Sequence, residues 1–526
     1  MMRGCSVGVA SLLAVFAGGI ASAQLRVVNW NVTLYSSGRQ SIIANAVYGQ
    51  VPAALPLAGQ SMSPDVLIGQ EFANTQASID NFLAALNNAP GSPGDWAAAP
   101  LITSPDTTNA FFYRTSKLHF EAGVVISFAT GSTSLPPRHT MRYDTRLVGY
   151  GDVPGTNISF YGTHMKAGSA STDQSRRLLE ANKIRDNANG LDTNGEGTAL
   201  PAGVMFMIGG DFNIQSSSQA AYVRMVGSEA INTGRFFDPI KSPGTWNNSG
   251  AFRFIHTQDP STSGQGGMDD RHDQLLICGQ LIDGVGFDYI GDANIPYSTT
   301  TWNDPNHSYR CWGNDGSTYD GSLAIATNQM VGPIIAQALV DDANSGGSSG
   351  GHLPVLLDLR VPARIASTET IDFGEVELNS VASADLNVYN AADVGLWTLS
   401  GVADLHYSLA ATAGIEVPAG SFFDAPGGSQ NTHAVTLDTS VAGEVSGEIT
   451  IASDAPDQPV RTVLVSAVVV VSCPADFDGD GFLSGVDFDL YVQAFEAGDM
   501  AADFDQDGFL TGADFDLYVQ AYEAGC

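Results

Sequence analysis

Short apolar runs alternate with longer mixed stretches over residues 24–362. Arg26–Asn31 and Val66–Gly69 are typical of buried strands. Ser175–Asp186 and Gly332–Ala343 are typical of helices. Because strands and helices are interleaved along the chain, this region predicts an α/β domain built from packed layers.

A different pattern begins after Val361–Arg364, which we interpret as a linker. Residues 363–472 contain short alternating or β-branched runs separated by turn residues, which is typical of a β-sandwich of roughly 100 residues. The predicted strands are Ile371–Phe373, Asp385–Val388, Ala434–Leu437, Gly447–Ile451 and Thr462–Val471.

Residues 473–526 contain an internal repeat. The segment Asp476–Asp487 recurs as Asp503–Asp514, and each copy continues into Phe-Asp-Leu-Tyr-Val-Gln-Ala, which predicts a short helix. Both copies have acids at positions 1, 3, 5 and 12 and a glycine at position 6, which is the spacing of a Ca²⁺-binding loop. The predicted side-chain ligands are Asp476, Asp478, Asp480, Ser484 and Asp487 in the first loop, and Asp503, Asp505, Asp507, Thr511 and Asp514 in the second.

The alternative for this region is an acidic, solvated tail, but such a tail would not keep Gly481 and Gly508 in register. Aspartate at position 12, where EF-hand sensors usually carry glutamate, resembles dockerin modules. The resemblance implies a small helical, EF-hand-like dockerin domain over residues 473–526 that docks to a cohesin-like protein partner.

The N-terminus has the features of an export signal. Arg3 precedes the apolar run Val7–Ile20, and Ala21–Ala23 provides a small-residue cleavage site. We therefore expect a signal peptide over residues 1–23, cleaved near Ala23, and a secreted or cell-surface protein. No later segment is predicted to cross a membrane.

Four cysteines remain after the signal peptide, and an even count in an exported chain suggests disulfides. Pairing within domains predicts Cys278–Cys311 and Cys473–Cys526. The alternative is that these cysteines are buried free thiols.

Length and charge limit the possibilities further. A chain of 526 residues is too long for one hydrophobic core. The net charge is -34, but residues 24–362 hold 19 basic and 29 acidic side chains, so the acidity is concentrated in the last third. This balance argues mildly against tight binding of duplex nucleic acid, which takes its affinity from basic side chains on phosphates.

The stretch Gly209–Asn213 is the first candidate for chemistry. It follows the apolar run Val204–Ile208, so a glycine turn at a strand end presents Asp211 and Asn213 side by side. Oxygen ligands at a rigid strand end suit a hard cation such as Mg²⁺. Similar polar strand ends recur at Asn29–Asn31, Pro64–Glu71, Gly162–Ala167, Asp269–Asp273 and Gly351–Val355. Carboxylates, amides and two histidines in this setting suit metal-assisted hydrolysis of a phosphodiester.

The ordered series WN, QE, THxKA, GDFN, DxRxD and HLPV over residues 25–360 resembles the endonuclease/exonuclease/phosphatase family. That family includes deoxyribonuclease I, AP endonucleases, sphingomyelinases and inositol phosphatases. The resemblance implies a four-layer α/β sandwich, in which two packed, mostly antiparallel sheets are flanked by helices.

The resemblance also implies a role for each matching residue. Asn31 and Glu71 would hold Mg²⁺ or Mn²⁺, while Asp211 and Asn213 would lie near the scissile phosphate. Arg142 would steady the phosphate charge.

Two histidines receive catalytic roles in the same way. His352 would serve as a general base or as a phosphate-polarising group, oriented by Asp273. His164 would bind the phosphate or assist the leaving group. His256, His272 and His307 match no such role, so we interpret them as structural.

One position departs from the family pattern. The family usually has aspartate before the His-Leu-Pro-Val segment, and here that residue is Gly351. Losing a carboxylate that helps the metal site leaves two functions open. The first is an exported metal-dependent phosphodiester or phosphomonoester hydrolase, acting on DNA, RNA, phospholipid or nucleotide. The second is an inactive binding or scaffold protein whose function lies in the dockerin-like tail and in the middle domain, which resembles an immunoglobulin-like sandwich.

Overall fold

The computed structural model describes residues 25–195, 197–261, 266–346, 350–392 and 401–525. The chain divides into two compact units. The first unit contains the described residues up to Arg364, with residues 391–392, 401–404 and Ala455–Asp457; the second contains the rest. The expected signal peptide, residues 1–23, lies outside the described residues. No helix in the described ranges is long and apolar enough to cross a membrane.

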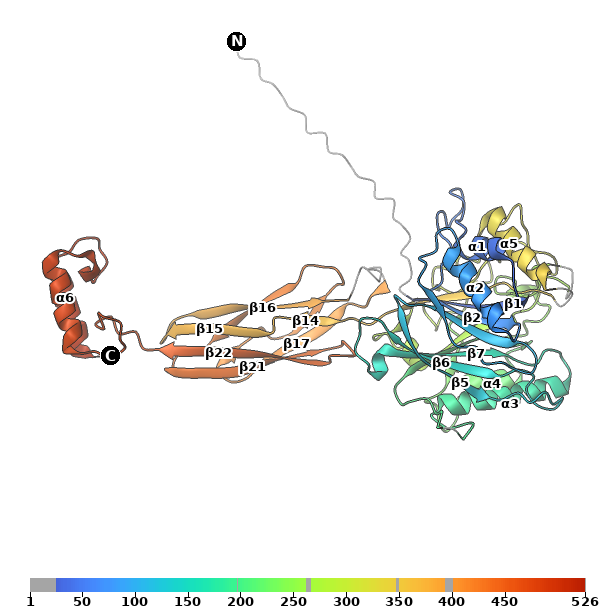
Figure 1. Ribbon diagram of the computed structural model, residues 1–526, viewed down its shortest axis with the longest axis horizontal. Helices are drawn as coiled ribbons and strands as arrows, with labels where there is room; N and C mark the ends of the chain where they lie inside the picture. Colours follow the sequence, from blue (N-terminus) through green and yellow to red (C-terminus); the bar gives the residue numbers. More distant parts are fainter. Residues whose placement is uncertain (1–24, 196, 262–265, 347–349, 393–400, 526) are drawn as a thin grey trace, which may run out of the picture. The chain divides into compact units, whose positions relative to one another are not determined.

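Two sheets form the centre of the first unit (Figure 1). The first has the strand order β11(Asp288–Tyr289), β13(Val355–Arg360), β1(Leu25–Tyr35), β2(Val66–Phe72), β4(Thr108–Arg114) and β3(Trp96–Ala98), with β12(Arg310–Cys311) also paired to β13. The second has the order β5(Leu118–Ser127), β6(Thr140–Leu147), β7(Asn157–His164), β8(Met205–Asp211), β10(Asp273–Cys278) and β9(Phe236–Phe237). Only the β1–β2 and β7–β8 pairs are parallel among these pairings of the described strands.

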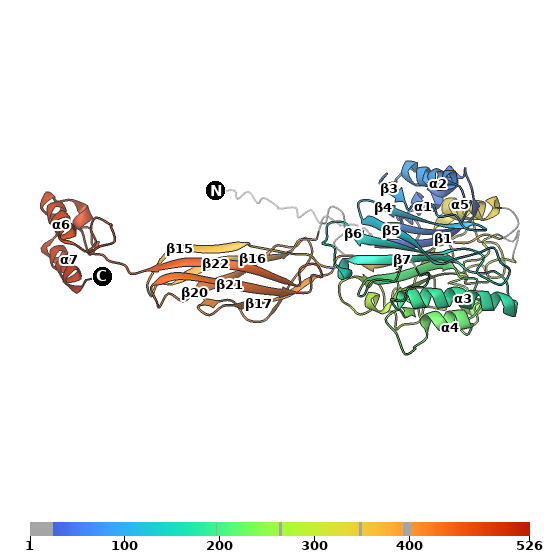
Figure 2. The same cartoon turned by 60° about the horizontal axis from the view of Figure 1, so that its bottom comes forward.

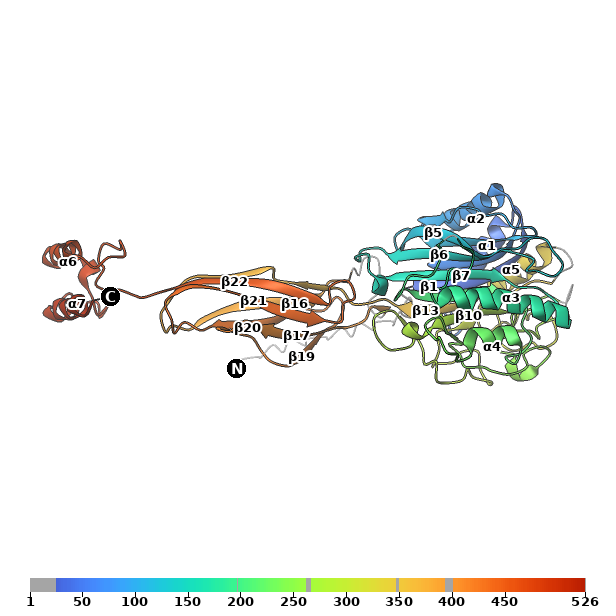
Figure 3. The same cartoon turned by 90° about the horizontal axis from the view of Figure 1, so that it is seen from below.

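The inner faces of the two sheets pack against each other through large aromatic residues. The ring of Phe111 on β4 stacks on that of Tyr143 on β6, with centroids 4.6 Å apart. Gly209 lets the sheets approach closely, since a Cβ there would lie 2.9 Å from the Ile68 side chain. Helices cover the outer faces, which gives the mixed α/β sandwich that the sequence predicted (Figures 1 and 3).

The covering helices belong to two groups. Helices α1(Gln40–Tyr48), α2(Gln76–Asn88) and α5(Gly332–Ser345) lie over the first sheet, and α3(Ser171–Ala188) and α4(Ala220–Val226) lie over the second (Figure 3). The predicted helices Ser175–Asp186 and Gly332–Ala343 are confirmed within α3 and α5.

The second unit contains two further sheets. Their strand orders are β14(Ile365–Ser367), β16(Ala382–Asn390), β20(Asn431–Leu437), β18(Ile415–Glu416), and β15(Thr370–Glu377), β22(Val460–Val470), β21(Gly443–Ser453), β17(Leu405–Ala411), β19(Ser421–Asp424). Buried and accessible side chains alternate along β22, as expected for a sheet with one face in a core. All five predicted strands of this region are present; the immunoglobulin-like assignment stays a prediction.

The repeat of the second unit folds as two helices, α6(Gly485–Ala497) and α7(Gly512–Ala524) (Figure 2). The rings of Tyr491 and Tyr518 stack between them, with centroids 3.6 Å apart. Ser484 and Thr511 cap the two helix N-termini through their hydroxyl groups. The equivalent residues of the two repeats therefore form a small symmetric core.

The predicted Cys278–Cys311 disulfide is wrong, because both residues are buried free thiols. Cys278 ends β10 in one sheet, whereas Cys311 lies in β12 of the other sheet. Burial raises the pKa of Cys278 to about 11 and that of Cys311 to about 12, which keeps both sulfurs protonated. Cys526, the predicted partner of Cys473, lies outside the described residues, so that pairing stays a prediction.

We expect Cys278 and Cys311 to resist alkylation in the folded protein, since each residue is only 1% exposed. Peptide mapping after iodoacetamide treatment should show both residues modified at least about 10-fold more slowly in buffer than in denaturant. Prior reduction should not change this ratio. Alkylation that appears only after reduction would instead mean that the two residues are disulfide-bonded.

Candidate functional site

The candidate site lies where the carboxyl ends of both parallel strand pairs meet. Asn31 and Glu71 lie near the ends of β1 and β2, and His164 and Asp211 end β7 and β8. His164 pairs with Asp211, and Asp211 pairs with Asp273, so these three residues form a row across the second sheet. The structure thus brings together Asn31, Glu71, His164, Asp211, Asp273 and His352.

Backbone irregularities occur in this site at one residue in or next to each sheet. The pairing of β2 with β4 shifts register between Gly69 and Phe72, which marks a bulge. Glu71, inside this bulge, has a φ of 63°, a left-handed conformation that costs a non-glycine residue about 1–3 kcal/mol. Asn213, after β8, is also left-handed, with a φ of 51°. Such strain gathers at functional sites, since packing must hold it in place.

Asn31 connects the carboxylates of the two sheets. Its Nδ2 donates to Glu71 Oε1 at 3.2 Å and to Asp211 Oδ2 at 3.1 Å. Its Oδ1 accepts a hydrogen bond from the backbone N–H of Thr33 at 3.0 Å, which fixes the orientation of the amide. The fully buried amide therefore offers one hydrogen to each acid.

His164 lies between the same two acids. Its Nε2 is 3.2 Å from Asp211 Oδ2, and its Nδ1 is 3.8 Å from Glu71 Oε1. Burial, together with the charge of Arg138, lowers the pKa of His164 well below its usual value, so the ring is neutral near pH 7. A neutral imidazole is the form that binds a metal.

Glu71, His164 and Asp211 fit a divalent cation. One ligand atom from each lies within 4.8 Å of the other two. The buried Nδ1 of His164 makes no hydrogen bond within the described part of the chain, so it has a lone pair or a proton to give. Two carboxylates and an imidazole suit Mg²⁺, Mn²⁺ or Zn²⁺.

His352 and Asp273 form a buried dyad beside Asp211. His352 Nδ1 is 2.6 Å from Asp273 Oδ2, and its Nε2 is 3.7 Å from Asp211 Oδ2. Burial lowers the pKa of His352, but the charges of Asp273 and Asp211 outweigh it and raise the pKa to about 10. His352 therefore carries a positive charge at neutral pH. Burial acts to raise the pKa of Asp211, yet His164 and His352 hold it below its usual value.

Asn213 supports Asp211 from the following loop. Its backbone N–H donates to Asp211 Oδ1 at 3.1 Å, and its Nδ2 donates to the carbonyl of Met165 at 3.2 Å. The amide therefore holds the chain after β8 against the chain after β7, next to His164.

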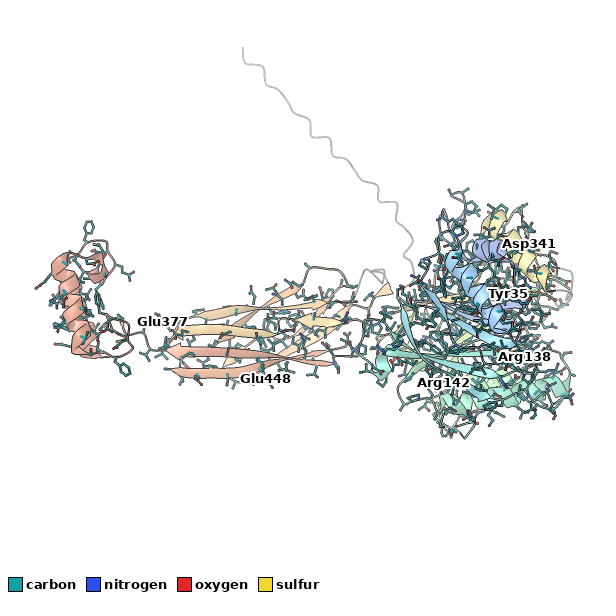
Figure 4. The ribbon with its side chains drawn as sticks, in the orientation of Figure 1. Tyr35, Arg138, Arg142, Asp341, Glu377 and Glu448 are labelled. Atoms are coloured by element: carbon teal, nitrogen blue, oxygen red, sulfur yellow. The ribbon has the colours of Figure 1, made fainter. Side chains whose placement is uncertain are left out.

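Arg142 is not brought to this cluster. It lies opposite Tyr161 on β7, and its guanidinium bonds with Asp144, Asn187 and the carbonyl of Thr198. Asn187 is on α3, so Arg142 faces the outer side of the sheet, away from the site. Figure 4 labels Arg142 and Arg138 at separate positions in this unit.

Arg138, which the sequence reasoning missed, is the arginine closer to the site. Its charge lowers the pKa of His164, and its Nη2 is 2.8 Å from Asp106 Oδ2. It lies in the loop between β5 and β6, at the edge where the site is. The sequence did contain a signal for Arg138. Pro136 and Pro137 come just before it, which places Arg138 in the loop before β6 and not in the strand.

Thr257 and Gln258 were also missed. Thr257 Oγ1 donates to Asp273 Oδ2 at 2.7 Å, and Gln258 Nε2 is 3.3 Å from His352 Nε2. Neither residue stands in a motif or a regular strand, so no sequence signal pointed to them. Of the histidines without a role, His272 Nε2 is 3.7 Å from Asp270, and His307 bonds with the Tyr289 hydroxyl.

The two repeat loops form compact acidic clusters. Candidate ligand atoms of Asp476, Asp478 and Asp487, and of Asp503, Asp505 and Asp514, lie within 4.8 Å of one another in each loop. Gly481 and Gly508 have φ values of 83° and 85°, which explains the glycine at position 6. Among the other predicted ligands, Asp480 and Asp507 accept backbone N–H groups within the loops, and Ser484 and Thr511 are the helix caps.

Gly351, where the family pattern has aspartate, is tightly enclosed. A Cβ on this residue would lie 2.1 Å from the Cβ of Ala343 and 2.3 Å from its Cα, both on α5. The nearby acids do not replace the missing one: Asp342 pairs with Arg39 at 3.1 Å, and Asp341 accepts from Gln337. Figure 4 marks Asp341 on α5.

We expect Gly351→Ala to destabilise the first unit by about 2–4 kcal/mol, because the added methyl group must displace α5. Chemical denaturation followed by tryptophan fluorescence would measure this. Ala343→Gly should rescue only part of the loss, since the Cα of residue 343 remains within 2.3 Å. A fully stable Gly351→Ala protein would contradict this close packing.

No family model matches the chain, and no curated protein matches it either. Solved structures similar to it include the human nocturnin catalytic domain with bound sulfate, at 11% identity and TM-score 0.34, covering 65% of this chain and 94% of that one. Two proteins of Bacteroides thetaiotaomicron are also similar. An endonuclease/exonuclease/phosphatase family protein has 15% identity, covers 64% and 97% of the two chains, and has TM-score 0.33. A mannosyl-6-phosphatase has 13% identity, covers 64% and 99%, and has TM-score 0.33. These structural neighbours belong to the endonuclease/exonuclease/phosphatase group, but with TM-scores below 0.5 we base the function on the site alone.

Proposed function

We propose that residues 24–362 form an exported hydrolase of phosphate esters, a phosphodiesterase or nuclease that depends on Mg²⁺ or Mn²⁺. The main support is the convergence on one carboxylate. Asp211 Oδ2 lies within 3.7 Å of polar atoms of Asn31 in β1, His164 at the end of β7 and His352 in the chain just before β13. Such a set of buried acid, amide and imidazole groups suits metal-assisted attack on phosphorus.

A cation at this site would be held by Glu71 and Asp211, with His164 as a further donor. Asn31 would join them through Oδ1 once its amide turns over, since Nδ2 now faces both acids. When bound, the cation would polarise a phosphoryl oxygen and neutralise charge in the transition state. Its arrival would also relieve the repulsion between the two carboxylates, which Asn31 and His164 now lie between.

The chain's own groups have distinct roles in this proposal. His352 is protonated near neutral pH, which favours its role as a positively charged group that polarises the phosphate over that of a general base. Asp273 holds the ring through Nδ1 and leaves Nε2 facing Asp211. Asp211, which stays ionised, can accept a hydrogen bond from the attacking water and orient it. Asn213 fixes the carboxylate of Asp211 in that orientation.

Charge favours a small substrate over a long nucleic acid. Residues 24–362 hold 29 acidic against 19 basic side chains, and the buried Arg142, Arg177, Arg185 and Arg271 cannot contact a phosphate backbone. Tight binding of duplex DNA requires several exposed basic residues. We therefore favour a compact phosphate ester, such as a nucleotide or a phospholipid head group.

The rival proposal is an inactive binding or scaffold protein, and the packing around Gly351 favours it. No side chain fits at this position, so the usual carboxylate cannot be supplied from it. On this view, the second unit carries the function.

The second unit supports a tethering role under either proposal. Its two acidic loops would take up Ca²⁺, and the folded helix pair would dock to a cohesin-like partner. Asp476 already accepts backbone N–H groups from Gly479 and Gly481, so the loop is folded around the predicted ligand.

The wild-type protein should hydrolyse bis-(4-nitrophenyl) phosphate with Mg²⁺ or Mn²⁺ and lose this activity in EDTA. Glu71→Ala and His164→Ala should each lower kcat by about 100- to 1,000-fold, because each removes a group that contacts the reacting phosphate or its cation. His119→Ala and Glu121→Ala, which alter exposed residues of β5, serve as matched controls. Wild-type protein without turnover in any of Mg²⁺, Mn²⁺ and Ca²⁺ would favour the scaffold proposal.

Calorimetry should detect Ca²⁺ uptake by the wild-type chain that is lost in Asp476→Ala/Asp503→Ala. These variants remove position 1 of both loops, the carboxylate around which each loop folds. Asp489→Ala/Asp516→Ala, which removes equal charge from α6 and α7, should leave uptake intact. Equal loss in both double variants would mean that general acidity attracts the ion.

A further inference from the structure

The segment after His164 connects the proposed site to helix α3. Met165 donates its N–H to the Asp211 carbonyl at 2.9 Å, and its own carbonyl accepts from Asn213 Nδ2 at 3.2 Å. The next residue, Lys166, makes its backbone hydrogen bonds with side chains of α3 instead. Any shift of Lys166 would therefore move Met165, and with it His164 and Asn213.

Two buried side chains of α3 hold the backbone of Lys166. Glu180 Oε2 accepts its N–H at 3.3 Å, and Arg177 Nη1 donates to its carbonyl at 2.5 Å. Arg177 Nη1 also donates to the carbonyl of Gly168 at 2.8 Å, and its Nη2 donates to Gln219 Oε1 at 3.0 Å. Both polar groups of one peptide segment are thus bound by residues one helical turn apart.

These side chains are unusual for a helix that only covers a sheet. Glu180 and Arg177 are 0% exposed, although burial of ionisable groups costs several kcal/mol unless they are well paired. Glu180 Oε1 and Arg177 Nε make no hydrogen bond within the described part of the chain. Apolar residues would pack better at these positions, so packing does not explain the two buried ionisable side chains. Their hydrogen bonds to the backbone of Lys166 explain them.

We propose that Glu180 and Arg177 are positioning residues that hold His164 and Asn213 in place around Asp211 by fixing the backbone of Lys166. The inference rests on the proposed hydrolase, because the residues act on groups that would touch the substrate and its cation. They act through the chain and do not contact the site themselves.

The electrostatic setting agrees with this role. Burial raises the pKa of Glu180 to about 8, while the Lys166 N–H and the charges of Arg138, Arg176 and Arg177 oppose the rise. The carboxyl group is therefore neutral near pH 7. In the unfolded chain a glutamate titrates near pH 4.3. Stability from the neutral group is complete below that pH and is lost as pH rises through about 8.

The test compares Glu180→Leu with Glu180→Gln in the full chain. Leucine cannot accept the Lys166 N–H, so kcat should fall by about 10- to 100-fold with KM changed by less than about 3-fold, as expected for a misplaced catalytic group. Glutamine keeps the acceptor and should keep at least half of the wild-type kcat. The stability of the wild-type protein should also fall as pH rises from about 4.3 to about 8, and Glu180→Gln should lack this part of the pH dependence.

Arg185 provides a matched control on the same helix. It is also fully buried, and it bonds the carbonyls of Met225 and Ile231, away from the site. Arg177→Met and Arg185→Met should lower the melting temperature by similar amounts. Only Arg177→Met should also lower kcat. Equal loss of kcat in both variants would overturn the proposal.

Hydrogen exchange separates this proposal from the proposed function. The Lys166 amide should exchange about 10-fold faster or more in Glu180→Leu and at the wild-type rate in Glu180→Gln. This result would support the contact even in a protein without turnover, where only the hydrolase proposal would fail. An unchanged Lys166 exchange rate in Glu180→Leu would overturn the positioning role whatever the activity.

Discussion

The contact between Asn31 and Asp211 joins the two sheets at the edge where the candidate site is built. Asn31 belongs to the first sheet and Asp211 to the second, and the same amide also reaches Glu71. Without this donor, the carboxylates of Glu71 and Asp211 would lose the amide that bonds to both, and their like charges would repel each other more strongly. The positions of His164 and His352 follow from that of Asp211, since each lies within 3.7 Å of its Oδ2. The site therefore depends on one shared amide group.

Much of the site could be predicted because its residues stand at strand ends. A short apolar run fixes where a strand ends, and the parallel pairs β1–β2 and β7–β8 bring those ends to one edge. This is why Asn31, Glu71, His164 and Asp211 were found from the sequence. The acidic loops were found for a similar reason, because position 6 needs a left-handed residue and glycine marks it. Both patterns span only a few consecutive residues, so they can be recognised from the sequence alone.

The predictions that failed needed information on strand register, on which sheet a strand belongs to, or on the path of irregular chain. Arg142 differs from a site residue only by strand register, since a shift of one position moves a side chain to the opposite face. The sequence does not contain that register, and the arginine by the site is instead Arg138. Cys278 and Cys311 were paired by their even count, yet they belong to different sheets. Thr257 and Gln258 reach the site through irregular chain, which no periodic pattern marks.

Helix α5 limits what position 351 can carry. Its Ala343 fills the space beside Gly351, so an aspartate introduced there would clash with backbone atoms of the helix. A carboxylate at this position would need α5 to move away from the chain before β13. Any redesign that adds an acidic ligand to the site would therefore have to place it at another residue, or change position 351 and the helix together.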